Sequence, residues 1–282
     1  GMSEYAGAGA PAPAPALRPP RRRGRRPEAS RCDRLFGPRR AAVGVPMMVP
    51  RIRAGLGPAD FESLLAGIER FPVGERIALR RVLHSEGPDG VLAHPAFDPD
   101  VAWRTAPLTG VRFPLFVYAV VRRALVRRQV GEAEVADYVA TVIIEFGHGK
   151  RAWSVDGMGE HPAEYLVDVV LAGERGVPGT GQHLGNLALW LAGLFPDHIA
   201  IRQTRHGAPG LEYYDTMGGS GYRRAADEET RSDEELATLM RRLAGGFPVV
   251  RRALNEVSDT HFFPGPGPDP VERLLRQVSE GM

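Results

Sequence analysis

The chain has 282 residues, of which 43% are apolar, so its length fits one large domain or two small ones with a sizeable core. It contains no run of about 18 apolar residues and no basic segment followed by an apolar one near the N-terminus. We therefore expect neither a membrane span nor a secretory signal. Cys32 is the only cysteine, which excludes an intramolecular disulfide and a thiolate zinc site and favours a reducing cytoplasm.

The charge is divided unevenly along the chain. Residues 1–53 hold 12 arginines against three acidic residues, a net charge of +9, whereas the remainder holds 24 basic and 31 acidic residues, a net charge of −7. Lys150 is the only lysine, and such arginine use is typical of a GC-rich bacterial genome. Arginine clusters therefore carry less functional weight here than they do elsewhere.

We expect residues 1–46 to form a disordered basic tail rich in proline, alanine and arginine, and residues 47–282 to form a single helical domain. A basic arm on an acidic body favours weak, non-specific contacts with nucleic acid, or contacts with its own body. The body contains no recognisable helix-turn-helix, so only the arm is a candidate for nucleic acid. Met47 and Met48 stand where the composition changes, and a translation start there is the alternative, under which the arm has no role.

The first elements of the body are two predicted helices, over 59–71 and 74–84. Pro58 suits the first turn of a helix, and the sequence Pro72-Val73-Gly74 separates the two segments. Four prolines follow within residues 87–113, which predicts a loop with at most one short turn.

The clearest pattern is a pair of amphipathic helices over 114–146. Apolar residues recur at helical spacing on both sides of Gly131. So short a link predicts an antiparallel αα-hairpin. The arginines between Arg122 and Arg128 lie largely opposite the apolar stripe, and we expect them to pair with the acids Glu132, Glu134 and Asp137 or to meet an acidic partner.

The remainder of the body also has a helical pattern. Tyr165 to Leu171 is β-branched enough for a strand, but its acidic start favours a helix. Thr180 is a candidate cap for a helix with a regular leucine face that Pro196 ends or kinks. Further helices are predicted over 197–205, 210–227, 233–244, 247–262 and 271–280. The predicted fold class is all-α, an irregular multi-helix bundle.

One short motif has the spacing of a metal site. Glu145 and His148 form a Glu-x-x-His pair, as in carboxylate-bridged di-iron bundles, but those sites need a second pair and two more carboxylates, which are missing. We therefore predict no cofactor. Glu145 also lies at the negative end of its helix, and we expect it to pair with a nearby cation such as His148 or Lys150.

Several polar and aromatic side chains are candidates for the walls of a ligand pocket. His183, Asn186 and Trp190 share one helical stripe, and the alternative for such a stripe is hydrogen bonding between neighbouring helices. The full set of pocket candidates is His183, Asn186, Trp190, Asp197, His198, Tyr213 and Tyr214.

Gly218, Gly219 and Gly221 lie inside a predicted helix, where each costs about 1 kcal/mol relative to alanine. They predict a break or bend, or a surface where another backbone or a ligand approaches closely. A small anion held by Ser220, Arg223 and Arg224 is a further hypothesis.

No complete catalytic constellation or cofactor fingerprint is present in the sequence. This favours a non-catalytic helical module that binds or regulates a protein partner, or forms a homodimer, through its helix faces. The alternative is an enzyme or a small-ligand receptor with a polar pocket around His183, Asn186, Trp190, Tyr213 and Tyr214.

Overall fold

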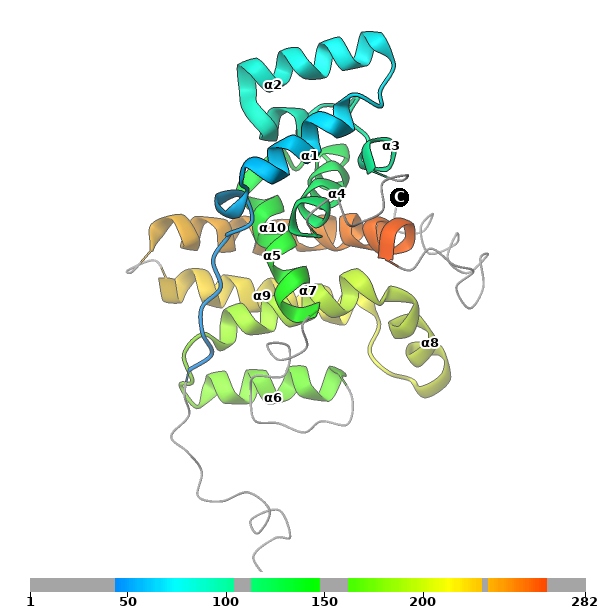
Figure 1. Cartoon of the computed structure of the whole chain (residues 1–282). Coiled ribbons are helices and arrows are strands. Elements are labelled where there is room, and N and C mark those ends of the chain that lie inside the picture. The colour runs from blue at the N-terminus through cyan, green and yellow to red at the C-terminus, as the bar shows by residue number, and fades with distance from the viewer. Residues whose placement is uncertain (1–43, 104–112, 148–161, 230–232, 263–282) are drawn as a thin grey trace, which may run out of the picture. The chain divides into compact units, whose positions relative to one another are not determined.

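The structure is a computed structural model that describes residues 44–103, 113–147, 162–229 and 233–262. Every regular element in these residues is a helix, which confirms the predicted all-α class (Figure 1). Most of the basic tail, His148 and the predicted helix over 271–280 lie outside the described residues.

The N-terminal part of the body contains α1 (Pro58–Ile68), α2 (Val73–Ala93) and α3 (Pro99–Trp103). Pro58 begins α1 as predicted, and the Asp60 carboxylate accepts the amide of Gly57 at 2.9 Å. The predicted loop from residue 87 is wrong in part, because α2 continues to Ala93. Gly87 provides the bend with a φ of +74°, and Pro88 then begins the second segment, where a missing N–H costs little.

The hairpin of α4 (Phe113–Arg127) and α5 (Ala133–Gly147) is confirmed, and the two helices pack against each other. Their apolar stripes are buried, as the spacing predicts. The Tyr165 segment lies in α6 (Pro162–Glu174), so the helical interpretation is also confirmed there.

The centre of the fold consists of α7 (Thr180–Leu194), α9 (Leu211–Glu229) and α10 (Glu234–Val257), which pack against one another. In Figure 1, α6 lies on the opposite side of α7 and α9 from α10, and it packs on α7. Pro196 begins α8 (Pro196–His206), which turns away from α7 by 87°. Thr180 is not the cap of α7, because Gly179 precedes it in a left-handed conformation and no side-chain cap is formed.

The predicted break in α9 is wrong, and the close-approach alternative is what the structure contains. A Cβ placed on Gly221 would lie 2.7 Å from the amide nitrogen of Gly185 and 2.8 Å from the carbonyl oxygen of Gly181. The glycines therefore allow the backbones of α7 and α9 to touch. This explains how a helix that contains three glycines remains continuous.

A single helix, α10, replaces the two predicted over 233–244 and 247–262. Gly245, Gly246 and Pro248 lie within it, although glycine and proline weaken an isolated helix by about 1 and 3 kcal/mol. The flanking side chains Leu243 and Phe247 are both buried. Burial of such side chains contributes about 1.5–3 kcal/mol each, which offsets those costs. In the described residues no single helix is long and apolar enough to cross a membrane. The bent pair α7 and α8 together has the length and the composition of a membrane span.

Residues 44–56, which we call the strap, run across the helices before α1. The Gln182 side chain of α7 binds the backbone of buried Met48 twice: its Oε1 accepts the Met48 amide and its Nε2 donates to the Met48 carbonyl, both at 2.7 Å. The amide of Val45 donates to the carbonyl of Pro178 at 3.0 Å. Backbone groups of the strap are thus hydrogen-bonded to the Gln182 side chain and to the turn before α7.

A second anchor of the strap is Asp137 in α5. Its carboxylate accepts the amides of Ile52 at 2.7 Å and Arg53 at 3.3 Å. Burial raises the pKa of Asp137, although the two amides act in the opposite direction. The strap also provides the cation for Glu145, because Arg51 forms an ion pair with it. The predicted need for a cation at this helix end is met, but from a distant part of the sequence.

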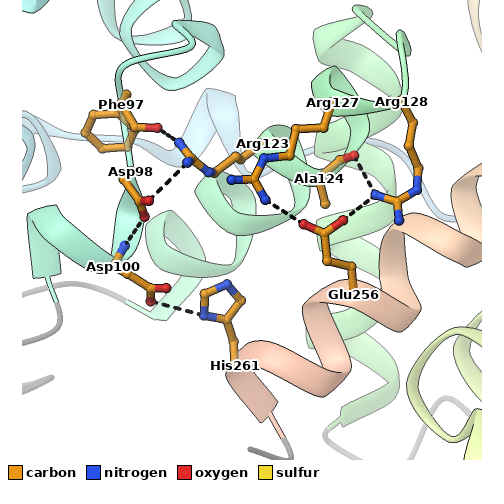
Figure 2. Close-up of polar contacts among 9 residues, drawn as sticks. All are labelled: Phe97, Asp98, Asp100, Arg123, Ala124, Arg127, Arg128, Glu256 and His261. Atoms are coloured by element: carbon orange, nitrogen blue, oxygen red, sulfur yellow. Dashed lines mark hydrogen bonds and ion pairs between the residues drawn. The ribbon is translucent and has the colours of Figure 1, made fainter. Parts of the chain in front are cut away.

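The arginines of α4 do not pair with the head of α5 as expected. Arg127 and Arg128 both bind Glu256 of α10, with Arg127 Nη1 at 2.7 Å from Glu256 Oε1 (Figure 2). The α5 acids bind the strap instead, since Asp137 accepts its amides and Glu134 lies 3.5 Å from Arg53. Arginines from the hairpin therefore tie it to α10.

A further group of polar contacts, next to the Glu256 ion pairs, involves the start of α3. Arg123 donates to Asp98 at 3.0 Å and to the carbonyl of Phe97, and the Asp98 carboxylate accepts the amide of Asp100 at 2.9 Å (Figure 2). His261 Nδ1 lies 3.4 Å from Asp100. These contacts join α3, α4 and the π-helical turn Ser258–Phe262.

Candidate functional site

The polar stripe on α7 lies inside the core. Asn186 Oδ1 accepts the hydroxyls of Tyr138 at 2.7 Å and Tyr222 at 2.9 Å, so it joins α5, α7 and α9. Burial raises the pKa of the Tyr222 hydroxyl well above its ordinary value, which keeps it a hydrogen-bond donor. Asn186 therefore has the helix-linking role that the sequence offered as the alternative to a pocket wall.

The other two members of the stripe are packed against aromatic rings. His183 is 3% exposed, with ring centroids 5.7 Å from Phe146 and 6.3 Å from Tyr165. Trp190 is half-buried and lies 6.0 Å from Phe146 and 5.1 Å from Phe195. Neither side chain is part of the lining of the cleft described next.

A cleft, which we call the α8 cleft, lies beside α8 and the loop that follows it. Its outer lobe has a volume of about 710 Å3 and its inner lobe about 270 Å3. The two lobes are adjacent, because they share four lining residues: His198, Arg202, Ala208 and Pro209. The predicted residues that line the cleft are His198, Tyr213 and Tyr214. Asp197 lies next to them in the first turn of α8 but is not part of the lining.

The outer lobe carries an excess of positive charge. Among the described residues its lining includes Arg202 and Arg205, with the imidazoles of His198 and His206, and one acid, Glu164 of α6. In the described part of the chain Arg205 has no carboxylate partner. Arginines near a half-enclosed surface bind carboxylates and phosphates through charge-assisted hydrogen bonds.

The inner lobe is apolar and deeper. Its walls include Leu191, Ile199 and Tyr214, which are 7%, 5% and 4% exposed. Phe195 is a further wall residue, and Trp190 supports it from behind. The lobe is therefore formed by the bend between α7 and α8 and by the start of α9.

Two tyrosines add hydroxyl groups to the cleft. Burial raises the pKa of Tyr213 in the outer lobe. Burial also raises the pKa of Tyr214 in the inner lobe, although the nearby Arg202 guanidinium acts in the opposite direction. Both hydroxyls therefore stay protonated at neutral pH and are able to donate a hydrogen bond.

The other predicted sites are distributed over the fold. Arg224 donates to the carbonyl of Gly173 at 2.6 Å and to Glu228 at 2.9 Å, Ser220 donates to the Met217 carbonyl, and Arg223 is exposed. The anion hypothesis for these residues stays a prediction. Among the described residues no three His, Cys, Asp or Glu side chains gather as metal ligands would, and the Glu145 partner His148 lies outside them.

A buried polar group that the sequence did not predict completes the end of α7. Asn255 donates to the carbonyls of Ala192 at 2.7 Å and Gly193 at 2.9 Å, which have no partners within a helix that ends there. Arg251 binds Asn255 at 3.0 Å and Asp215 at 2.8 Å. This network fixes the end of α7 from which the cleft begins. The residue spacing within α10 could not predict this network, because the carbonyls that Asn255 binds lie about 60 residues away in the sequence.

Comparisons of the chain with protein-family models, with curated proteins and with solved structures gave no match. The candidate site therefore rests on its own geometry.

Proposed function

We propose that this chain is a binding protein for a small organic anion, which it holds in the α8 cleft. The observation that carries the proposal is the outer lobe of about 710 Å3, whose described lining includes two arginines, Arg202 and Arg205, and one acid, Glu164. A volume of this size lies within the range of small-molecule sites, which combine apolar walls with a few polar groups. The function remains binding, as the sequence favoured, but the site moves from the helix faces to a cleft.

The polar groups of the cleft suit an oxyanion. Arg202 and Arg205 provide planar, permanently charged donors, and the Tyr213 hydroxyl provides a neutral one. A carboxylate or a phosphate ester accepts several such hydrogen bonds at once. We also propose a reducing bacterial cytoplasm as the setting, which the single cysteine and the arginine-rich composition support.

Isothermal titration calorimetry of the full chain with benzoate, hexanoate and phenyl phosphate tests the proposal. At least one of these anions should bind, and the variant Arg202→Gln/Arg205→Gln should weaken that binding by about tenfold or more, since each charge-assisted hydrogen bond is worth about 1.5–3 kcal/mol. The matched control is Arg241→Gln/Arg242→Gln, which removes two exposed arginines from α10. Equal effects of the two double variants, or no binding of any probe at millimolar concentration, would contradict the proposal.

A further inference from the structure

The two lobes of the α8 cleft differ in chemistry, and this difference bears on what the ligand is. The described lining of the outer lobe includes half-buried Arg202 and exposed Arg205, whereas apolar and aromatic side chains make up six of the eight lining residues of the inner lobe. A small hydrophilic anion needs only the outer lobe. Because the inner lobe is adjacent to the outer lobe and shares Arg202 with it, it provides space for an apolar group attached to the same molecule.

The volume of the inner lobe sets the size of that apolar group. A cavity of about 150 Å3 holds one benzene ring. The inner lobe has about 270 Å3, which is close to twice that volume. It therefore fits a fused pair of aromatic rings, or a branched aliphatic group of the same bulk, better than a single ring. Phe195 and Tyr214 provide aromatic walls against which a flat ring packs favourably.

The residues shared by the lobes set the position of the acid group. His198 and Arg202 line both lobes, and Arg202 is close enough to the Tyr214 hydroxyl to influence its pKa. A ligand whose rings fill the inner lobe therefore lies beside Arg202, which is part of its wall. An acid group attached directly to the rings is then close to that guanidinium.

We propose that the ligand of the α8 cleft is a compact aromatic acid: a bicyclic apolar body in the inner lobe, with a carboxylate or phosphate attached to it at Arg202 and His198. This inference rests on the proposed function, because it specifies the anion bound by the same cleft. A peptide or a second copy of this chain would also bring apolar and acidic groups together. The inner lobe favours a single compact group, because its volume is small and Arg202 is part of its wall.

The experiment compares three probes by calorimetry on the full chain: 2-naphthoate, benzoate and 2-naphthalenemethanol. The first has both the bicyclic body and the charge, the second lacks one ring, and the third lacks the charge. We expect 2-naphthoate to bind at least about tenfold more tightly than either of the others, because each lacks one of the two matched interactions. Equal affinities of 2-naphthoate and benzoate would overturn the inference while the proposed function stands. Absence of binding by both acids would overturn the inference, and the proposed function is overturned with it only if hexanoate and phenyl phosphate also fail to bind.

Two substitutions of Ala208 test whether 2-naphthoate binds in the inner lobe. Ala208 lines both lobes from the loop after α8, so Ala208→Trp should fill the inner lobe without altering a helix, whereas Ala208→Ser should leave it open. We expect Ala208→Trp to reduce 2-naphthoate binding to the level of benzoate and Ala208→Ser to bind as the parent does. Thermal unfolding of both variants verifies that they are folded. Unchanged 2-naphthoate affinity in a folded Ala208→Trp variant would overturn the inference, as would a concentration-dependent dimer that this variant abolishes, because the occupant would then be a second copy.

Discussion

Arg122 is a buried charge that the described residues leave without a hydrogen-bond acceptor at two of its nitrogens. It is 6% exposed on α4, and neither Nε nor Nη1 has a partner. A buried guanidinium without a carboxylate loses hydration and gains little in return. We therefore expect Arg122→Met, which keeps the length of the side chain and removes its charge, to raise the free energy of unfolding by about 1–3 kcal/mol.

Urea unfolding followed by circular dichroism measures this effect. The matched control is Arg127→Met, one turn further along α4, which removes an ion pair with Glu256 and should lower the free energy of unfolding by at most about 1 kcal/mol. Destabilisation by Arg122→Met comparable to that of the control would contradict the prediction.

Sequence periodicity at the residue scale identifies which side chains face inward, but not what they meet. The spacing of His183 and Asn186 correctly places both on one inward stripe of α7. The acceptor role of Asn186 depends on Tyr138 and Tyr222, which belong to other helices and are 48 and 36 residues away. Of the residues predicted for a pocket, His198, Tyr213 and Tyr214 line the α8 cleft and lie on either side of one short loop, and their role in binding stays a prediction.

Glycines illustrate the same limit for whole elements. Local propensity predicts a weak point in α9, and the contact between α9 and α7 provides the compensation that no local pattern reveals. The division predicted within α10 is wrong for the same reason. The two helices of the hairpin over 114–146 were predictable because their apolar stripes are long and regular. The α2 extension was not, because four prolines outweigh a short buried stretch.

The close contact of α7 and α9 makes a direct prediction. In Gly221→Ala the new methyl group meets backbone atoms of α7 at under 3 Å, so the helices must separate. We expect a loss of about 1–3 kcal/mol in the free energy of unfolding. Gly245→Ala on α10 is the control, because nothing lies within 4 Å of its Cβ position, and it should stabilise the protein by about 0.5–1 kcal/mol. Thermal unfolding that ranks the two variants in the opposite order would show that the helices do not touch at Gly221.

Glu256 couples two helices through charge, and its effect depends on pH. Burial alone raises the pKa of Glu256, but hydrogen bonds from Arg128 and Arg127 overcome this and hold the pKa below its ordinary value of 4.5. A lowered folded-state pKa means that the stabilisation is fully present above about pH 4.5 and is lost as the pH falls through the folded-state value. Glu256→Gln should therefore cost roughly 0.5–1 kcal/mol at pH 7 and little in strong acid.

Unfolding free energies of the parent protein and the Glu256→Gln variant between about pH 3 and pH 7 measure that difference. In the background Arg127→Gln/Arg128→Gln the pH-dependent part of the difference should reverse its sign, because burial then raises the folded-state pKa of Glu256 with no arginine to oppose it. A difference between the parent and the Glu256→Gln variant that is equal at all pH values would show that the ion pairs contribute nothing.

At the scale of the whole described domain, the strap connects the segment before α1 to the centre of the fold. Val45 and Met48 make contacts with the turn before α7 and with α7 itself, so the fold includes residues ahead of Met47. The sequence placed the start of the body at residue 47 because the composition changes there. Amino-acid composition cannot reveal the contacts of Val45, Met48 and Ile52, because their partners lie 85 to 134 residues away along the chain.

The strongest of these anchors gives a pH-dependent test of the strap. Gln182→Glu keeps the shape of the side chain and the acceptor for the Met48 amide, but its ionised form places a buried negative charge against the Met48 carbonyl. When protonated, the same carboxyl group donates to that carbonyl as glutamine does. Burial thus raises the folded-state pKa, and the variant's stability is greatest in acid and is lost as the pH rises through that pKa.

We expect Gln182→Glu to be close to the parent at about pH 5 and to fall below it by about 2–4 kcal/mol at about pH 8, with trypsin then cleaving after Arg51 and Arg53 in the released strap. Gln203→Glu is the control, because the same change on exposed α8 should leave a constant, small difference. Mass spectrometry identifies the cleavage sites, and urea unfolding gives the free energies. A pH-independent loss in Gln182→Glu, or a strap equally resistant to trypsin at both pH values, would show that the Gln182 contact does not hold the strap to the helices.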